Sequence, residues 1–323
     1  MNPLKSREAI LALVILVLLA AVASRFPGFV RPGNLAKVLT DTAPLIILAL
    51  GQMAVILTKC IDLSIAATLA LCGMVAGLLN MAGVPLPLIL LAVTGLGAAL
   101  GALNGLLVWK LDIPSIVVTL GTMTIYRGAI FLLTDGKWIN AHQMSAGFKA
   151  FPRMVFLGLP MMTWIMLAIV LGAAVLLTRT ALGRAFYAVG GNPHAAVYTG
   201  ISVGRTQFWA FLLSGALAGL TGYLWVARYA VAYVDIAAGF ELDVVAACVI
   251  GGVAIAGGAG SVAGAVMGAL FLGIVKNALP VIGISPFWQM AISGSAILIA
   301  IAFNASRSGA KGRIILRQAE HRA

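Results

Sequence analysis

The sequence predicts an all-α polytopic membrane protein with about ten transmembrane helices. Of its 323 residues, 62% are apolar and only 9% are charged, and the mean hydropathy is +1.09. A soluble domain carries roughly 25% charged residues. Apolar windows of the roughly 20 residues that a helix needs to cross the membrane recur along the chain. Because the sequence lacks the alternation typical of a membrane barrel, helices are the way left to satisfy the backbone in lipid.

We expect one transmembrane domain over residues 1–307 and a basic tail over 308–323. The predicted spans cover residues 8–24, 35–58, 62–82, 86–109, 114–134, 160–178, 206–228, 241–257, 260–280 and 286–304. The first apolar stretch ends in Ala21-Val22-Ala23, which imitates a signal-peptide cleavage site. We expect this helix to be retained, because a multispanning protein needs no cleaved leader.

The distribution of basic residues predicts that both termini are cytoplasmic. The net charge is +12, but Lys and Arg are spread over short loops, which favours a membrane face over nucleic acid. With the N-terminus inside, the inner segments hold 12 of the 21 basic residues. The segment after Asn304 alone carries five basic residues against one acid, Glu320.

The ten spans divide into two halves of five, which must be inverted relative to each other if they are related. Asp62-Leu63 opens the third span from the inside, and Glu241-Leu242-Asp243 opens the eighth from the outside. Such faint internal similarity is typical of inverted repeats. Two short acidic matches leave two alternatives open, inverted halves and unrelated halves.

Two sets of glycines spaced four residues apart predict close helix packing. Each set lies on one face of one predicted helix, and lipid provides no hydrophobic drive that would otherwise bring helices together. The sets are Gly97, Gly101 and Gly105, and Gly260, Gly264 and Gly268. A phosphate-binding loop is the functional alternative for the second set, but its spacing is not GxGxxG and no strand precedes it.

The sequence also lacks an ATP-binding motif of its own. Its one Gly-Lys pair, Gly136-Lys137, has Phe131 where the phosphate-loop pattern GxxxxGK[ST] requires glycine, and Trp138 where it requires Ser or Thr. We therefore expect no cofactor and no enzyme activity in this chain. If ATP drives its function, another subunit binds the ATP.

The loop over residues 179–205 contains a short helix whose two ends are marked. Asn192 is a good N-cap, Pro193 suits the first helical position, and Gly200 suits the left-handed backbone conformation that ends a helix. Gly190 and Gly191 allow a sharp turn into it. A helix of two turns is marginal alone in water. It is either a connector packed on its own protein or a coupling helix for a partner ATPase, with Ala195 and Ala196 allowing close approach and Val197, Tyr198 and Ile201 making the contact.

Several motifs resemble the ribose-type permease family of ABC importers, in the family's order and over nearly the whole chain. They are Ile61-Asp62-Leu63-Ser64, Asn104-Gly105, residues 113–122 (IPSIVVTLGT), Tyr126-Arg127-Gly128, Gly183-Arg184 with residues 188–192 (AVGGN) and Ala195-Ala196, and Glu241-Leu242 with Ala246-Ala247, Gly251-Gly252 and Gly257-Gly258. One departure is Cys60, where the family usually has glycine. Gly136-Lys137-Trp138-Ile139 is similar to the branch that handles rhamnose and autoinducer-2.

The resemblance implies the partners and the site residues. It implies a second copy of the permease or a homologue, a cytoplasmic ABC ATP-binding subunit, and a periplasmic sugar-binding protein that delivers a monosaccharide of rhamnose, autoinducer-2 or pentose type. It also implies a multi-pass protein of the bacterial inner membrane, in contact with membrane lipid. The ATPase-contacting positions would be Gly183, Arg184, Gly190, Gly191, Asn192, Ala195, Ala196, Gly200 and Ile201.

Polar residues in the fifth span and at Asn104 are candidates for a sugar path. Thr119, Thr122 and Tyr126 recur at helical spacings of three and four, and a sugar needs groups that form hydrogen bonds. The alternative is that the threonines bond to carbonyls of their own helix.

The ionisable residues favour an external energy source. Asp62, Glu241 and Asp243 are expected at span ends, where hydration lowers the free-energy cost of a charged group. Lys276 is expected to snorkel, with its ammonium reaching to the membrane surface. An ion-coupled secondary sugar carrier is the main alternative and would place an ionisable residue near mid-span. An intramembrane enzyme would need a motif such as HExxH, which is absent. Cys60, Cys72 and Cys248 are expected to be small packing residues.

Overall fold

The computed structural model describes residues 7–281, 283, 288, 291, 294 and 295. Apart from those few positions, the predicted tenth span at 286–304 and the basic tail at 308–323 lie outside the described residues. The part described is mostly helical, which confirms the all-α fold class.

Seven helices in the described part of the chain are long and apolar enough to cross a membrane. They are α1 (Arg7–Arg25), α2 (Pro32–Leu57), α4 (Leu86–Leu111), α5 (Ser115–Thr134), α7 (Met161–Arg179), α10 (Val203–Tyr229) and α12 (Val262–Val281). An eighth apolar helix, α3 (Ile65–Met81), is slightly shorter. These eight helices correspond to eight of the ten predicted spans.

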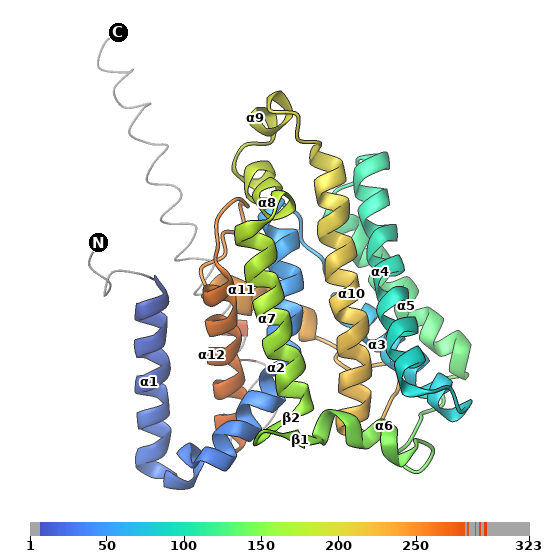
Figure 1. Ribbon diagram of the computed structural model, residues 1–323, viewed down its shortest axis with the longest axis vertical. Coiled ribbons are helices and arrows are strands. Elements are labelled where there is room, and N and C mark those ends of the chain that lie inside the picture. The colour runs from blue at the N-terminus through green and yellow to red at the C-terminus, as the bar shows by residue number, and fades with distance from the viewer. Residues whose placement is uncertain (1–6, 282, 284–287, 289–290, 292–293, 296–323) are drawn as a thin grey trace.

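Short elements occupy the two ends of the helix bundle (Figure 1). One end, called the α9 end here, carries α8 (Ala181–Gly191) and α9 (Pro193–Tyr198), and α1 begins at the same end. The opposite end, called the β-hairpin end, carries η2 (Pro27–Val30), α6 (Ala146–Ala150), η3 (Phe151–Arg153), and the paired strands β1 (Val155–Phe156) and β2 (Leu159–Pro160). Val155 pairs with Pro160 and Phe156 with Leu159, so residues 157 and 158 form a two-residue turn, and both Leu157 and Gly158 have positive φ.

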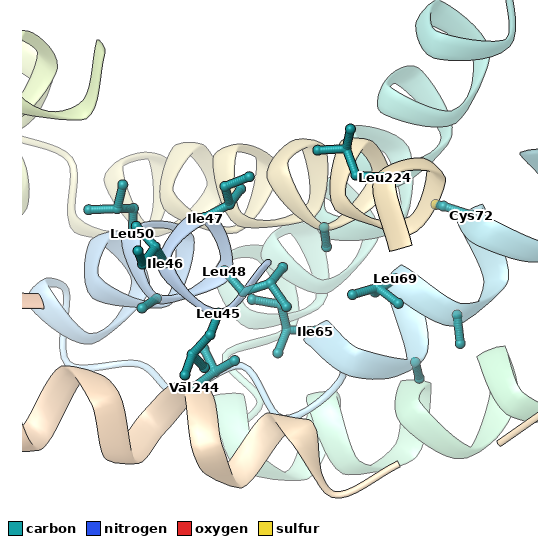
Figure 2. Close-up of a cluster of buried hydrophobic side chains, with 14 of the residues drawn as sticks. Leu45, Ile46, Ile47, Leu48, Leu50, Ile65, Leu69, Cys72, Leu224 and Val244 are labelled. Atoms are coloured by element: carbon teal, nitrogen blue, oxygen red, sulfur yellow. The ribbon is translucent and has the colours of Figure 1, made fainter. Parts of the chain in front are cut away.

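The core forms around α2, which buries almost every residue from Val38 to Leu57. Figure 2 shows side chains of α2, α3, α10 and the short helix α11 (Phe240–Ile250) meeting in one apolar cluster, among them Leu48, Ile65, Leu224 and Val244. Since lipid surrounds such a bundle, shape complementarity rather than water exclusion holds these helices together.

Glycines let α4 and α10 approach with their backbones almost in contact. A Cβ on Gly101 would overlap the carbonyl oxygen of Phe211, and one on Gly97 would overlap that of Gly215. The fit is reciprocal, because a Cβ on Gly215 would overlap the carbonyl oxygen of Gly97. Gly105 lies against the backbone of Phe208.

The second glycine set behaves differently from the prediction. Gly264 and Gly268 lie on α12 and pack against Gly251 and the carbonyl oxygen of Ala247. Gly260 precedes the helix and has an extended backbone with φ of 157°. The expectation that all three share one helix face is therefore wrong at Gly260.

The eighth predicted span, residues 241–257, is also wrong. α11 ends at Ile250 after 11 residues, which is about 16 Å of helix and about half the hydrocarbon thickness. The chain then turns through glycines with left-handed φ values, 87° at Gly252, 83° at Gly257 and 71° at Gly258. We call residues 251–261 the glycine loop.

Candidate functional site

The short helix α9 is built as its sequence predicts. The Asn192 side chain caps it by accepting a hydrogen bond from the Ala195 backbone N–H at 3.1 Å, and Pro193 occupies the first helical position. Gly200 follows with φ of 83°, which a glycine adopts without strain. The chain then enters α10, whose N-cap is Ser202.

Apart from His194, the exposed side chains of α9 are apolar or aromatic, and no other described residue covers them. Tyr198 is 91% exposed and Val197 is 59% exposed, whereas Ala196 is buried against the protein and Ile201 is half-buried. Ala195 also lies on the exposed side. Exposed apolar groups at the tip of a bundle are typical of a docking surface.

Helix α8, which leads into α9, packs closely against α7 and the glycine loop and so fixes the position of α9. Thr180 caps α8 by accepting from the Gly183 N–H, and a Cβ at Gly183 would overlap the backbone of α7 at Leu176. Tyr187 donates from its hydroxyl to the Gly260 carbonyl oxygen at 3.0 Å. Burial raises the pKa of the Tyr187 phenol, so this group stays protonated at neutral pH and keeps donating.

The predicted ATPase-contacting residues divide into two groups. Gly183 and Gly190 are buried where α8 packs against the rest of the protein, whereas Arg184 is exposed. Gly191, Asn192, Ala195 and Gly200 are also exposed, and they belong to α9 or flank it.

The predicted path residues lie inside the helix bundle. Asn104 is fully buried and donates to the Ser64 hydroxyl at 2.8 Å, and the Tyr126 hydroxyl donates to the Leu100 carbonyl oxygen at 3.0 Å. Thr119 donates to the carbonyl oxygen of Ser115 at 2.9 Å, and Thr122 donates back along the same helix. The threonines thus make the bonds to their own helix that the alternative interpretation expects.

Asp62 is not at a hydrated span end, which corrects the expectation from sequence. It is 2% exposed and lies in the segment that connects α2 to α3. Its carboxylate accepts from the Ser64 N–H at 2.9 Å, the Ser64 hydroxyl at 2.7 Å and the Ser214 hydroxyl at 3.3 Å. With its amide turned so that donors face acceptors, Gln52 bonds both backbone groups of Asp62 at 3.1 Å. This network pins the segment between the helices.

Lys276 has an acidic partner inside the bundle, which is a second correction: the sequence predicted that its side chain reaches to the membrane surface without one. It forms an ion pair with Asp243 across α11 and α12, and its ammonium lies 5.4 Å from the centroid of the Phe240 ring. A second ion pair joins Asp41 on α2 to Arg228 on α10, at 2.6 Å. A charge pair in an apolar bundle is costly to break, because one charge would remain unpaired.

At the β-hairpin end, α5 holds the segment that leads into α11. Arg127 donates to the carbonyl oxygens of Val234 and Ile236. Trp138 stacks on Tyr233 with ring centroids 4.6 Å apart. These contacts fix residues 230–239 at the entry to α11. The sequence signal that could have identified Arg127 is the motif Tyr126-Arg127-Gly128.

Cys60, Cys72 and Cys248 are free and buried, in line with packing roles. Within the described residues, no group of three or more His, Cys, Asp or Glu side chains is arranged to hold a metal ion.

Comparisons with known proteins identify relatives over most of the chain. A family described as "Branched-chain amino acid transport system / permease component" matches residues 34–301. The autoinducer 2 import system permease protein LsrC of Enterobacter sp. (strain 638) is 38% identical over 295 residues, which cover 91% of this chain and 85% of that protein. The protein of the same name from Salmonella typhi is 36% identical over 313 residues, covering 97% and 90%. The one from Klebsiella pneumoniae is 37% identical over 295 residues, covering 91% and 85%. No solved structure matches the chain.

Proposed function

Because the chain belongs to this family of transport-system permease components, we propose that it carries autoinducer 2, or a monosaccharide of similar size, across the bacterial inner membrane. It is the membrane-spanning permease subunit of an ABC-type importer and a multi-pass protein of that membrane. Such a subunit works with an ATP-hydrolysing subunit and a substrate-binding protein.

The observation that carries the proposal is the exposed helix α9. Its caps are satisfied from within the chain, while Val197 and Tyr198 offer apolar surface to a partner. Three basic residues lie on the elements next to it in the chain, Arg179 at the end of α7, Arg184 on α8 and Arg205 in the first turn of α10, and a surplus of positive charge marks the cytoplasmic side. We infer that α9 docks into the ATP-hydrolysing subunit and that Ala195 permits the close approach.

The complete topology we propose has ten membrane crossings, both termini in the cytoplasm and two inverted halves of five crossings each. In place of the continuous helix predicted at 241–257, one crossing consists of α11 together with the glycine loop, which reaches the end of α2 through the Gly258–Leu57 hydrogen bond.

Two features support the inversion. Two contacts join the halves in a reciprocal way: α4 of the first half packs on α10 of the second through glycines, and Gly273 on α12 of the second half packs on Thr42 of α2 in the first. The short helix α3 follows an acidic motif and α11 contains one, and both helices contribute side chains near their N-terminal ends, Ile65 and Val244, to the central apolar cluster (Figure 2). A single domain over 1–307 with a tail at 308–323, and a pore shared with a second permease copy or a homologue, complete this proposal.

The substrate path we propose runs beside α5 and α4. Asn104, Thr119, Thr122 and Tyr126 are neutral, and neutral hydrogen-bonding groups suit a sugar better than the charged ends of an amino acid. In the described conformation their polar groups are bonded within the chain. Opening the path would therefore exchange these bonds for bonds to substrate.

Uptake measurements test the proposed function. The chain is expressed with its ATP-hydrolysing and binding-protein partners in a strain lacking its own importer, and removal of autoinducer 2 from the medium is followed. We expect removal that continues when an ionophore collapses ion gradients while ATP is intact. Uptake of leucine instead would overturn the substrate proposal, and loss of uptake with the ionophore would favour an ion-coupled secondary carrier, the alternative that the Asp243–Lys276 pair could serve.

A variant pair tests the docking role of α9. Ala195→Glu places a charge on its exposed face and should abolish both uptake and co-purification of the ATP-hydrolysing subunit. Leu157→Glu places the same charge at the β-hairpin end, where Leu157 is 77% exposed, and should leave the complex intact. Co-purification at the wild-type level in Ala195→Glu would refute the docking role.

A further inference from the structure

Three backbone segments meet beneath α9 without side chains between them. The Gly258 N–H donates to the Leu57 carbonyl oxygen at 3.0 Å, which joins the glycine loop to the end of α2. A Cβ on Gly190 would overlap both the Leu57 carbonyl oxygen and the Gly258 nitrogen, so the end of α8 fills the remaining side. We call this contact of Leu57, Gly190 and Gly258 the junction.

The junction is specific to particular glycines. A Cβ on Gly258 would overlap the Gly191 nitrogen, and Gly258 has φ of 71° besides, so position 258 requires glycine for two reasons. A Cβ on Gly191, by contrast, would meet no atom of the described residues within 4 Å. Neighbouring glycines of one motif therefore have different roles, and one serves as a matched control for the other.

The two segments held by α8 differ in their freedom to move. α2 is buried along nearly its whole inner length and belongs to the central core. The glycine loop has left-handed glycines at positions 252, 257 and 258 and continues directly from α11. Tyr187 and Gly260 form a second contact between α8 and this loop. A shift of α8 would therefore displace the loop and α11 relative to α2.

α11 in turn connects the junction to the far end of the bundle. It is a single 11-residue helix, and its first residue follows the segment 230–239 that Arg127 holds by two carbonyl oxygens. The route is therefore continuous: α8 contacts the glycine loop, and the loop, α11 and segment 230–239 follow one another along the chain. Packed elements of this kind can carry a displacement between distant sites.

We propose that the junction transmits the nucleotide state of the partner ATPase from α9 to segment 230–239, with Gly190 as the positioning residue. This inference rests on the proposed function, since it needs an ATP-hydrolysing subunit docked on α9. It adds the route inside this chain, namely α8 to the glycine loop and then through α11.

A cysteine reporter at the far end tests the route without any sugar. Ala238→Cys places a thiol at an exposed position two residues before α11, and the native Cys60, Cys72 and Cys248 are buried. The full complex is purified, and the rate of maleimide labelling is measured with and without ATP plus vanadate. Site-to-site coupling commonly amounts to about 5–150-fold, so we expect at least about a fivefold change in the reporter complex.

Gly190→Ala should abolish this nucleotide-dependent change, and Gly191→Ala should preserve it. The amount of ATP-hydrolysing subunit that co-purifies is measured for each variant, and labelling rates are compared only between complexes that contain this subunit. Absence of the ATP-hydrolysing subunit from the reporter complex would count against the proposed function. If the subunit is present, an unresponsive reporter or a responsive Gly190→Ala complex would overturn the route.

A second variant keeps the test decisive if Gly190→Ala does not assemble. Tyr187→Phe removes the hydroxyl bond to Gly260 without adding volume, and it should reduce the nucleotide-dependent change at the reporter. A response equal to that of the unmodified junction in this variant would overturn the proposal.

Discussion

The crossing of α4 and α10 should respond very differently to one added methyl group at two positions of the same helix. A Cβ on Gly101 would overlap the Phe211 carbonyl oxygen and lie 3.0 Å from the Gly215 Cα, whereas a Cβ on Gly95 would meet no described atom within 4 Å. Backbone cannot rotate away as a side chain can, so the helices must separate. We take the upper end of the usual cost of overpacking, about 3 kcal/mol, for Gly101→Ala.

Helix propensity acts in the opposite direction at both positions. Replacing glycine by alanine inside a helix gains about 1 kcal/mol, so Gly101→Ala should lose about 2 kcal/mol in all and Gly95→Ala should gain about 1. At this chain length each kcal/mol shifts the midpoint of thermal unfolding by about 2 °C, which separates the two variants by about 6 °C.

Thermal unfolding of the two purified variants in the same detergent measures this difference. The control is the unmodified protein, which should unfold between them. If Gly101→Ala and Gly95→Ala unfolded at the same temperature, the close contact of the two backbones would not contribute to stability, and the packing argument for the glycines of α4 would fail.

Three further predictions concern polar side chains that are bonded within the bundle. Asp62→Ala leaves the Ser64 and Ser214 donors without their acceptor and should cost about 1–3 kcal/mol for each unsatisfied group, whereas Asp62→Asn keeps an acceptor oxygen and should be milder; thermal unfolding compares them. Asp243→Asn should destabilise by about 3–5 kcal/mol because the Lys276 ammonium loses its partner, and adding Lys276→Met should recover part of that loss in the same assay; a double variant no better than the single would contradict this. Arg127→Gln removes the donors to Val234 and Ile236 and should accelerate proteolysis of segment 230–239; an unchanged cleavage rate would show that Arg127 does not hold the segment.

Local sequence predicted the elements whose determinants are close together in the chain. The apolar windows located eight helices, from α1 to α12, because each such helix satisfies its own backbone bonds in lipid. Asn192, Pro193 and Gly200 predicted α9, since caps act on the nearest turn. The spacing of Gly97, Gly101 and Gly105 predicted a packing face, but not the partner helix, α10.

Hydropathy failed where glycine or a distant partner decides the conformation. It counted residues 251–257 as part of a span because glycine and alanine are not polar, although the left-handed glycines end α11 at Ile250. It placed Asp62 at a hydrated end because the signal averages neighbours in sequence, whereas the groups that bind Asp62 come from α10 and α2 as well as from Ser64.

The sequence by itself therefore determined that this chain is a helical membrane protein, where most of its helices lie, and that a capped helix projects between α8 and α10. Only the tertiary structure decided that Asp62 is interior, that Lys276 pairs with Asp243, and that a Cβ would fit at Gly191 but would overlap α2 and the glycine loop at Gly190. The physical reason is one of range. Helix formation and capping depend on residues within a few positions of one another, whereas burial, ion pairing and backbone contact depend on atoms that the fold brings together from far along the chain.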